Sequence, residues 1–93
     1  MDNGYACPCC GYLTLGEEPP GTYEICKVCH WEDDLVQFGD PSYEGGANGT
    51  SLTQARANFR SFGAISRKDL RRVRAPLPNE TPQFHWIERE ESE

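Results

Sequence analysis

The sequence lacks the features of a membrane, secreted or nucleic-acid-binding protein. No stretch approaches the roughly twenty apolar residues that a membrane-spanning helix needs. The first residues contain no basic segment followed by an apolar run, so we expect a cytoplasmic protein with no membrane partner. Basic residues are scarce in residues 1–50, where Lys27 stands against nine acidic residues. This distribution and a formal net charge of −6 would repel phosphate backbones, so we expect no nucleic-acid partner.

Common catalytic patterns are missing as well. The sequence shows no Ser-His-Asp arrangement and no glycine-rich loop with a lysine that would cradle a phosphate. Of its two histidines, His30 adjoins a cysteine and His85 has no partner at a metal-binding spacing. We therefore expect no enzymatic activity.

Four of the five cysteines form two matched pairs with the spacing C-x2-C-x15-C-x2-C. Each pair on a tight turn can hold one side of a metal ion, and this spacing is typical of a tetrahedral zinc site. An odd number of cysteines and a reducing compartment argue against disulfides. The predicted ligands of one structural Zn²⁺ are Cys7, Cys10, Cys26 and Cys29. In a chain of 93 residues with a thin core, such a site would contribute about 10–16 kcal/mol to folding.

Two other uses of the cysteines stay open as alternatives. An iron-binding electron-transfer centre would use similar turns, although His30 replaces the glycine that such turns place after the second pair. A thiol redox centre is disfavoured because the acidic residues 32–34 follow Cys29 and oppose thiolate formation. Cys9 lies inside the first turn and should point away from the metal, as a buried apolar filler. A reactive thiol or a substitute ligand is its alternative role.

The positions of the apolar residues, and of the glycines and prolines that interrupt regular structure, predict a single small α+β domain over residues 1–87. Its N-terminal part, residues 5–38, is expected to be a zinc-ribbon or rubredoxin-like β-hairpin. The two strands are predicted at residues 12–15 and 22–25. A polar, glycine-rich loop over residues 39–50 should follow.

Residues 51–62 carry the clearest helix signal. Ser51 and Gln54 match a capping box at its start, and Gly63 is placed to end it. One face should pack on the hairpin, and its apolar residues are Leu52, Ala55, Phe59 and Phe62.

An irregular C-terminal extension is predicted over residues 63–87. A short helix could begin near Ser66, and the basic run 67–74 is expected to fold back onto the acidic first half. Residues 84–87, with the sequence Phe-His-Trp-Ile, are predicted as an edge strand or a docked tail. Residues 88–93 should form a disordered acidic tail.

An acidic stretch beside an aromatic residue follows the second cysteine pair and consists of Trp31, Glu32, Asp33 and Asp34. One interpretation makes it a docking surface for a basic protein partner, with Trp31 as the anchor. The other interpretation packs Trp31 over the second cysteine turn while the acids are solvated or cap turns. We favour packing for Trp31 and keep the stretch as the candidate partner surface.

Three segments resemble the bacterial CPCC family of small cysteine-rich proteins: Cys-Pro-Cys-Cys-Gly-Tyr at 7–12, Tyr-Glu-Ile-Cys at 23–26 and Cys-x-Trp-Glu-Asp-Asp at 29–34. Further matches extend the resemblance over about residues 7–64, and they lie at 45–48, 51–52 and 55–59. The family usually has Pro where this chain has Lys27. The resemblance implies a zinc site and a bacterial origin, and it implies no reaction.

The sequence thus predicts a zinc-binding, non-catalytic protein that serves as a protein–protein interaction module. One concrete form is an immunity or regulatory protein that neutralises a basic toxin, because a small acidic fold suits that task electrostatically. The rival class is the iron electron-transfer or thiol redox protein.

Overall fold

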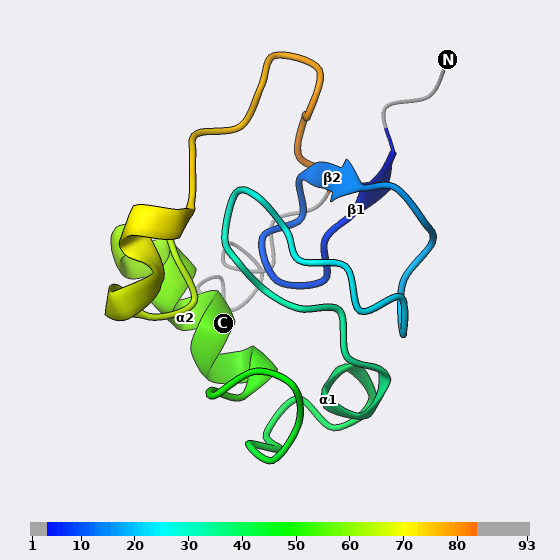
Figure 1. Ribbon diagram of the computed structural model, residues 1–93, viewed down its shortest axis with the longest axis vertical. Coiled ribbons are helices and arrows are strands. Elements are labelled where there is room, and N and C mark those ends of the chain that lie inside the picture. The colour runs from blue at the N-terminus through cyan, green and yellow to red at the C-terminus, as the bar shows by residue number, and fades with distance from the viewer. Residues whose placement is uncertain (1–3, 84–93) are drawn as a thin grey trace, which may run out of the picture.

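The computed structural model describes residues 4–83 and shows a small α+β fold of the zinc-ribbon type, as predicted. Its elements in chain order are β1 (Tyr5–Ala6), β2 (Leu13–Leu15), α1 (Leu35–Gly39), α2 (Leu52–Phe62) and the 3-10 helix η1 (Arg67–Arg72). Figure 1 shows the hairpin and the pair formed by α2 and η1 on opposite sides of the cyan segment that carries the second cysteine pair. In the part of the chain described, no helix is long and apolar enough to cross a bilayer.

The strand pairing differs from the predicted hairpin. β2 pairs antiparallel with β1, with Tyr5 opposite Leu15 and Ala6 opposite Leu13. This hairpin closes around the first cysteine turn, so both of its strands flank one pair of cysteines. The loop that this pairing closes, residues 7–12, is as long as the loop 16–21 of the predicted hairpin, so loop length does not select between the two pairings.

The predicted second strand is wrong. Within the described chain, residues 22–25 form no regular strand, and Ile25 makes an isolated bridge to Glu32 across the second cysteine turn. Tyr23 has a φ of 62°, which lies outside the β region and interrupts an extended backbone. Each cysteine turn therefore pairs its own flanks.

α2 occupies the segment with the clearest helix signal. The Ser51 side chain accepts a hydrogen bond from the Gln54 backbone N–H at 3.1 Å, as an N-cap should. Gly63 ends the helix with a φ of 95°, a left-handed conformation that glycine adopts readily. Leu52 and Ala55 are fully buried, so the predicted apolar face does meet the core.

Two short helices complete the fold. α1 was not anticipated, and its N-cap is Asp34, whose side chain accepts from the Gln37 backbone N–H at 3.0 Å. η1 lies where a short helix was expected after Ser66. The Ser66 hydroxyl donates to the Asp69 carboxylate at 2.7 Å instead of accepting from a backbone N–H.

The C-terminal extension runs back across both cysteine turns. The Arg74 N–H donates to the Lys27 carbonyl at 3.1 Å, and the Gln83 N–H donates to the Gly11 carbonyl at 2.8 Å. The basic run makes ion pairs inside the extension itself, from Arg72 to Asp69 at 3.0 Å and from Arg74 to Glu80 at 2.8 Å. These backbone hydrogen bonds bind the extension to the cysteine turns, and the His30 ring of the second turn lies 3.8 Å from the Asp69 carboxylate of the extension.

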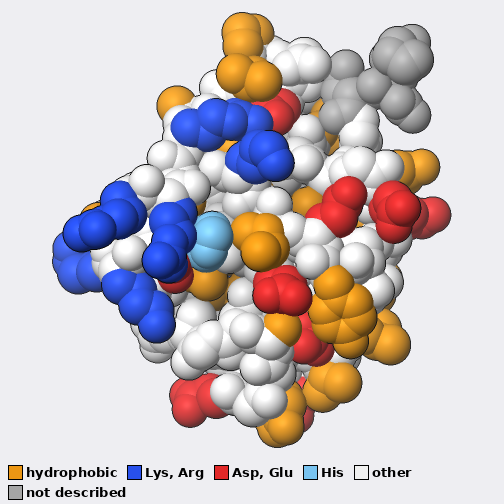
Figure 2. All heavy atoms as spheres, viewed as in Figure 1, with side chains coloured by type: hydrophobic (Ala, Val, Ile, Leu, Met, Phe, Trp, Pro, Cys, Tyr) orange, Lys and Arg blue, Asp and Glu red, His pale blue; other side chains and the backbone are white. Residues whose placement is uncertain are grey.

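Charges are segregated on the surface. Figure 2 shows Lys and Arg side chains gathered on one side of the molecule, with most Asp and Glu side chains toward the other.

The predicted tail segments at 84–87 and 88–93 lie outside the described residues.

The core is centred on sulfur. All five cysteines are buried, and the other members of the buried cluster are Leu15, Val28, Trp31, Leu52, Ala55 and Ile65. Tyr12 and Phe59 pack against this cluster with partial burial, and their rings meet edge-to-face at 6.3 Å. The cysteines therefore lie at the centre of what holds the chain together.

Candidate metal centre

The structure brings the four predicted ligands together. The sulfur atoms of Cys7, Cys10, Cys26 and Cys29 all lie within 4.8 Å of one another. The Sγ–Sγ distances across the two turns are 3.6 Å for Cys7 and Cys29 and 3.7 Å for Cys10 and Cys26. Cys7, Cys26 and Cys29 are fully buried, and Cys10 is 7% exposed. Sulfur atoms from both turns thus converge in the interior.

The two cysteine turns have the same backbone geometry. The Gly11 N–H donates to the Cys7 carbonyl at 2.8 Å, and the His30 N–H donates to the Cys26 carbonyl at 2.8 Å. Gly11 and His30, at the equivalent position, have φ angles of 82° and 77°. His30 therefore adopts the conformation that the sequence pattern assigns to glycine, at a cost of about 1–2 kcal/mol. Its imidazole lies 3.8 Å from the Asp69 carboxylate, which helps to hold it there.

Hydrogen bonds from the protein also reach the sulfur atoms. The Cys9 N–H donates to the Cys7 sulfur and the Val28 N–H to the Cys26 sulfur, both at 3.4 Å. The Thr14 hydroxyl donates to the Cys26 sulfur at 3.0 Å. Donors aimed at sulfur favour the thiolate form, which is the form that binds metal.

Without a cation, this cluster does not hold four negative charges. Hydrogen bonding from Cys10 and other neighbouring thiols, with Thr14, lowers the pKa of Cys26. Burial raises the pKa of Cys7 and the pKa of Cys29 well above their usual range. One thiolate is favoured and the others are penalised, so a divalent cation is what would stabilise all four.

The donor set fits a tetrahedral metal ion. Four sulfur ligands at about 2.3 Å from a zinc ion would lie about 3.8 Å from one another. The observed distances of 3.6 and 3.7 Å are close to this value. The four cysteines can therefore hold a metal ion, and a tetrahedral ion bound by all four would have no coordination position left for water or substrate.

Cys9 is not part of this cluster, although it is only 1% exposed. Its place in the first turn corresponds to that of Val28 in the second, because each donates its N–H to the sulfur two residues earlier. Both side chains belong to the buried apolar cluster. This placement matches the apolar filler expected of Cys9.

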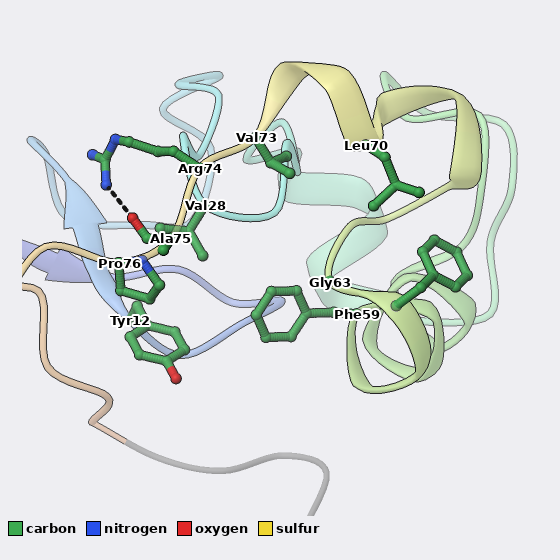
Figure 3. A pocket seen from close by; sticks show the side chains of 10 residues that line it. Tyr12, Val28, Phe59, Gly63, Leu70, Val73, Arg74, Ala75 and Pro76 are labelled. Atoms are coloured by element: carbon green, nitrogen blue, oxygen red, sulfur yellow. Dashed lines mark hydrogen bonds between the residues drawn. The ribbon is translucent and has the colours of Figure 1, made fainter.

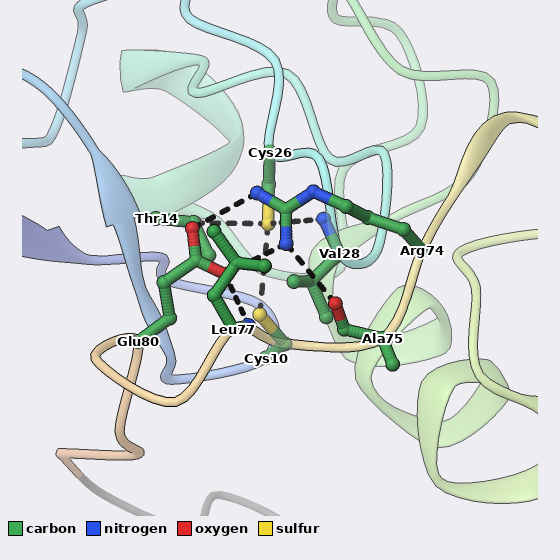
Figure 4. A network of polar contacts seen from close by, with 8 residues as sticks. All are labelled: Cys10, Thr14, Cys26, Val28, Arg74, Ala75, Leu77 and Glu80. Carbon is green, nitrogen blue, oxygen red and sulfur yellow. Dashed lines mark hydrogen bonds and ion pairs between the residues drawn. The ribbon is translucent and has the colours of Figure 1, made fainter.

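An ion pair in the extension lies beside the cluster, and no sequence pattern predicted it. Arg74 makes two hydrogen bonds to the Glu80 carboxylate, at 2.8 and 2.9 Å, and Glu80 also accepts from the Leu77 N–H. Figure 4 shows the Arg74 guanidinium in front of the Cys26 sulfur. Glu80, and to a smaller extent the negative charge on Cys26, raises the pKa of Arg74. The extension thus places a positive charge beside the cluster.

The predicted partner surface needs correction. Trp31 and Asp33 are fully buried, Asp34 is 5% exposed, and Glu32 is half-buried. Trp31 belongs to the core cluster, and its carbonyl closes the second turn by accepting from the Cys26 N–H. The stretch therefore lies inside the fold and does not form a docking surface there.

Its two aspartates bind backbone groups of the loops around them. The Asp33 carboxylate accepts from the Thr22 N–H at 2.9 Å and from the Thr22 hydroxyl at 2.8 Å. Asp34 accepts from the N–H groups of Ala47, at 2.8 Å, and Gln37, at 3.0 Å. These hydrogen bonds, that of Ala47 first, lower the pKa of Asp34. Both carboxylates have a structural role.

A buried amide network continues from this region, and the sequence did not point to it. Gln37 is fully buried and donates to the carbonyls of Tyr43 and Thr50, at 2.9 and 3.0 Å. Its carbonyl oxygen accepts from the side chain of Asn48 at 2.9 Å, and Asn48 exchanges two hydrogen bonds of 2.8 Å with the Glu32 backbone. This network fastens the glycine-rich loop to the second cysteine turn.

Comparison with known proteins places the chain in a described family. A family model described as "Cysteine-rich CPCC" matches residues 5–80, which include both cysteine turns, α1, α2 and η1. No curated protein matches the chain.

Proposed function

The chain belongs to the cysteine-rich CPCC family, and from that premise we propose that it is a non-catalytic protein in which one structural zinc ion holds a surface that binds another protein. The observation that carries the proposal is the buried cluster of four sulfur atoms. Catalytic zinc sites usually keep one position open for water, whereas four cysteines fill every position. In this proposal the metal stabilises the fold, and the surface of the folded protein carries out the function.

The surface around α1 supports the binding part of the proposal. Five large apolar side chains on or beside this helix are between 39% and 56% exposed: Tyr23, Leu35, Val36, Phe38 and Tyr43. We call them the α1 surface. Single exposed apolar residues are common on protein surfaces, but several large ones gathered around one short helix often mark an interface.

Charge indicates what kind of partner this surface fits. Exposed acidic side chains neighbour it in the sequence, and they include Glu17, Glu18, Asp40 and Glu44. Residues 1–50 hold a single base, Lys27. An apolar surface with acidic neighbours fits a basic protein, whose association it would also accelerate. We therefore move the proposed partner surface from the buried residues 31–34 to the α1 surface and the exposed acidic residues near it in the sequence.

The metal is tested by mass spectrometry of the native protein together with metal analysis. We expect one zinc ion per chain and a colourless sample. A red, iron-containing protein would contradict the zinc assignment, and a reductase activity that depends on Cys26 or Cys29 would contradict the non-catalytic one.

The binding surface is tested with a double variant, Leu35→Glu with Val36→Glu, beside the control Leu77→Glu. All three side chains are about half exposed, and Leu77 lies in the extension. Proteins captured from the source cells count only when they bind the wild type and the control, are lost with the double variant, and bind more weakly as salt rises. Equal capture by all three proteins would overturn the assignment of the α1 surface.

A further inference from the structure

An apolar groove runs between the end of α2, η1 and the C-terminal extension, with a volume of about 300 Å³. Figure 3 shows its side chains arranged around a common space, with Arg74 at one end. The apolar side chains that line it include Tyr12, Val28, Phe59, Phe62, Leu70 and Val73. We call it the C-terminal groove.

Its walls are only partly buried. Leu70 is 40% exposed, and Tyr12 and Phe59 cover the core cluster with partial exposure. Apolar surface left in this state gains stability when another apolar segment covers it, at about 25 cal/mol per Å². The groove therefore has room and a driving force for an apolar occupant.

The chain itself leads into this region. Pro82 pairs with Tyr12, and the Gln83 N–H donates to the Gly11 carbonyl at 2.8 Å. The last described residues are thus held beside Tyr12, which forms one wall of the groove. The next four residues, 84–87, have the sequence Phe-His-Trp-Ile. Extended, they span at most about 14 Å, so this wall of the groove lies within their reach.

Charge favours the same occupant. Residues 88–93 carry four glutamates and one arginine, whereas η1 carries four bases and one acid. Ten residues after Gln83 reach about 33 Å when extended, comparable with the 35 Å length of the molecule, so η1 lies within their reach. A basic partner would instead be repelled by η1 at the edge of the groove.

We propose that the chain's own residues 84–87 bind in the C-terminal groove, with Trp86 against its apolar wall and the acidic residues 88–93 facing η1. This inference does not depend on the α1 surface or on the identity of the metal. It assigns the groove to an internal segment, whose release would open a second binding surface.

Fluorine NMR of the full chain labelled with 5-fluorotryptophan tests the proposal. The sequence has two tryptophans, and fully buried Trp31 is an internal reference for a folded interior. Trp86→Phe assigns the two signals. We expect the solvent isotope shift of the Trp86 signal, between H₂O and D₂O, to be close to that of Trp31 and well below that of free 5-fluorotryptophan.

A variant pair then locates the contact. Leu70→Glu places a negative charge in the groove at a side chain that is already 40% exposed, and Val36→Glu places the same charge on the α1 surface. We expect Leu70→Glu to raise the isotope shift of Trp86 toward the free value while that of Trp31 stays unchanged. Val36→Glu should alter neither signal.

Three outcomes would overturn the proposal. The first is a Trp86 signal in the wild type with the isotope shift of the free amino acid. The second is a shielded Trp86 that Leu70→Glu does not expose, which would place the indole elsewhere. The third is shielding that disappears on dilution, which would assign the groove to the tail of a second copy.

Discussion

Two adjacent buried cysteines allow a sharp test of the metal centre. Cys9 is 1% exposed and Cys10 is 7% exposed, yet only Cys10 belongs to the cluster of four sulfur atoms. Replacing each by alanine removes the same atom from neighbouring positions in one turn. Any difference between the variants then reports metal binding rather than loss of packing.

The expected effects differ greatly in size. Structural zinc contributes about 10–16 kcal/mol to folding in small metal-binding domains, and a domain has a total stability of about 5–15 kcal/mol. Loss of a group that only hydrogen-bonds a ligand already weakens metal binding 10–100-fold, so Cys10→Ala should weaken it by more than about 100-fold. Cys9→Ala should cost about 1–2 kcal/mol of unfolding free energy through lost packing and leave zinc affinity unchanged.

Competition with a zinc-sensitive chelator measures the affinity, and near-UV circular dichroism of fully buried Trp31 measures the fold. We expect Cys10→Ala to lose the near-UV signal at a chelator concentration that leaves Cys9→Ala native. Equal loss of zinc affinity in both variants would refute the assignment of the ligands. A wild-type protein that keeps its near-UV signal after complete removal of the metal would refute the structural role.

Three further predictions concern the polar contacts around α1. Gln37→Ala should lower the free energy of unfolding by about 2–5 kcal/mol in chemical denaturation, because it leaves buried carbonyls unpaired; a loss below 1 kcal/mol would contradict the network. In Gly46→Ala, the added Cβ would lie 2.7 Å from Gln37 and 2.8 Å from Asp34, so we expect a loss of about 1–3 kcal/mol. Gly49→Ala is its control, since that Cβ would meet no described atom within 4 Å, and equal effects would argue against the crowding. Because folding lowers the pKa of Asp34, its charge should stabilise the protein above the ordinary aspartate pKa of about 3.9 and lose this effect as the pH falls through the lowered value. Asp34→Asn should therefore be less stable than the wild type near pH 7, and the difference should shrink in acid; a difference that stays constant with pH would contradict the assignment.

Helix α2 depends on interactions between residues close in sequence and was predicted correctly, whereas the contacts of the acidic stretch depend on distant residues and were not predicted. Ser51 and Gly63 mark the ends of α2 because capping depends on residues within one turn of the helix. His30 shows a limit of such local reasoning. The sequence shows a departure from glycine at this position, but the structure shows the left-handed conformation retained.

The acidic stretch shows the opposite case. Charged residues are usually exposed, so one interpretation placed Asp33 and Asp34 on a docking surface, whereas the other had them solvated or capping turns, and Asp34 does cap α1. Their burial depends on N–H groups of Thr22 and Ala47, which lie eleven and thirteen residues away. No local pattern tells a solvated carboxylate from one that binds a distant loop.

The sequence by itself identified the four cysteines that the structure brings together and that can hold a metal ion, because a C-x2-C turn is a local structure and two such turns leave few other uses for four thiols. It also determined α2 through its caps and apolar period. Only the tertiary structure decided which strands pair, that Gln37 and Asn48 build a buried network, and that Arg74 and Glu80 form an ion pair beside the sulfur cluster. These features depend on contacts between loops that are distant in sequence, where hydrogen bonding and burial outweigh the local preferences of each residue.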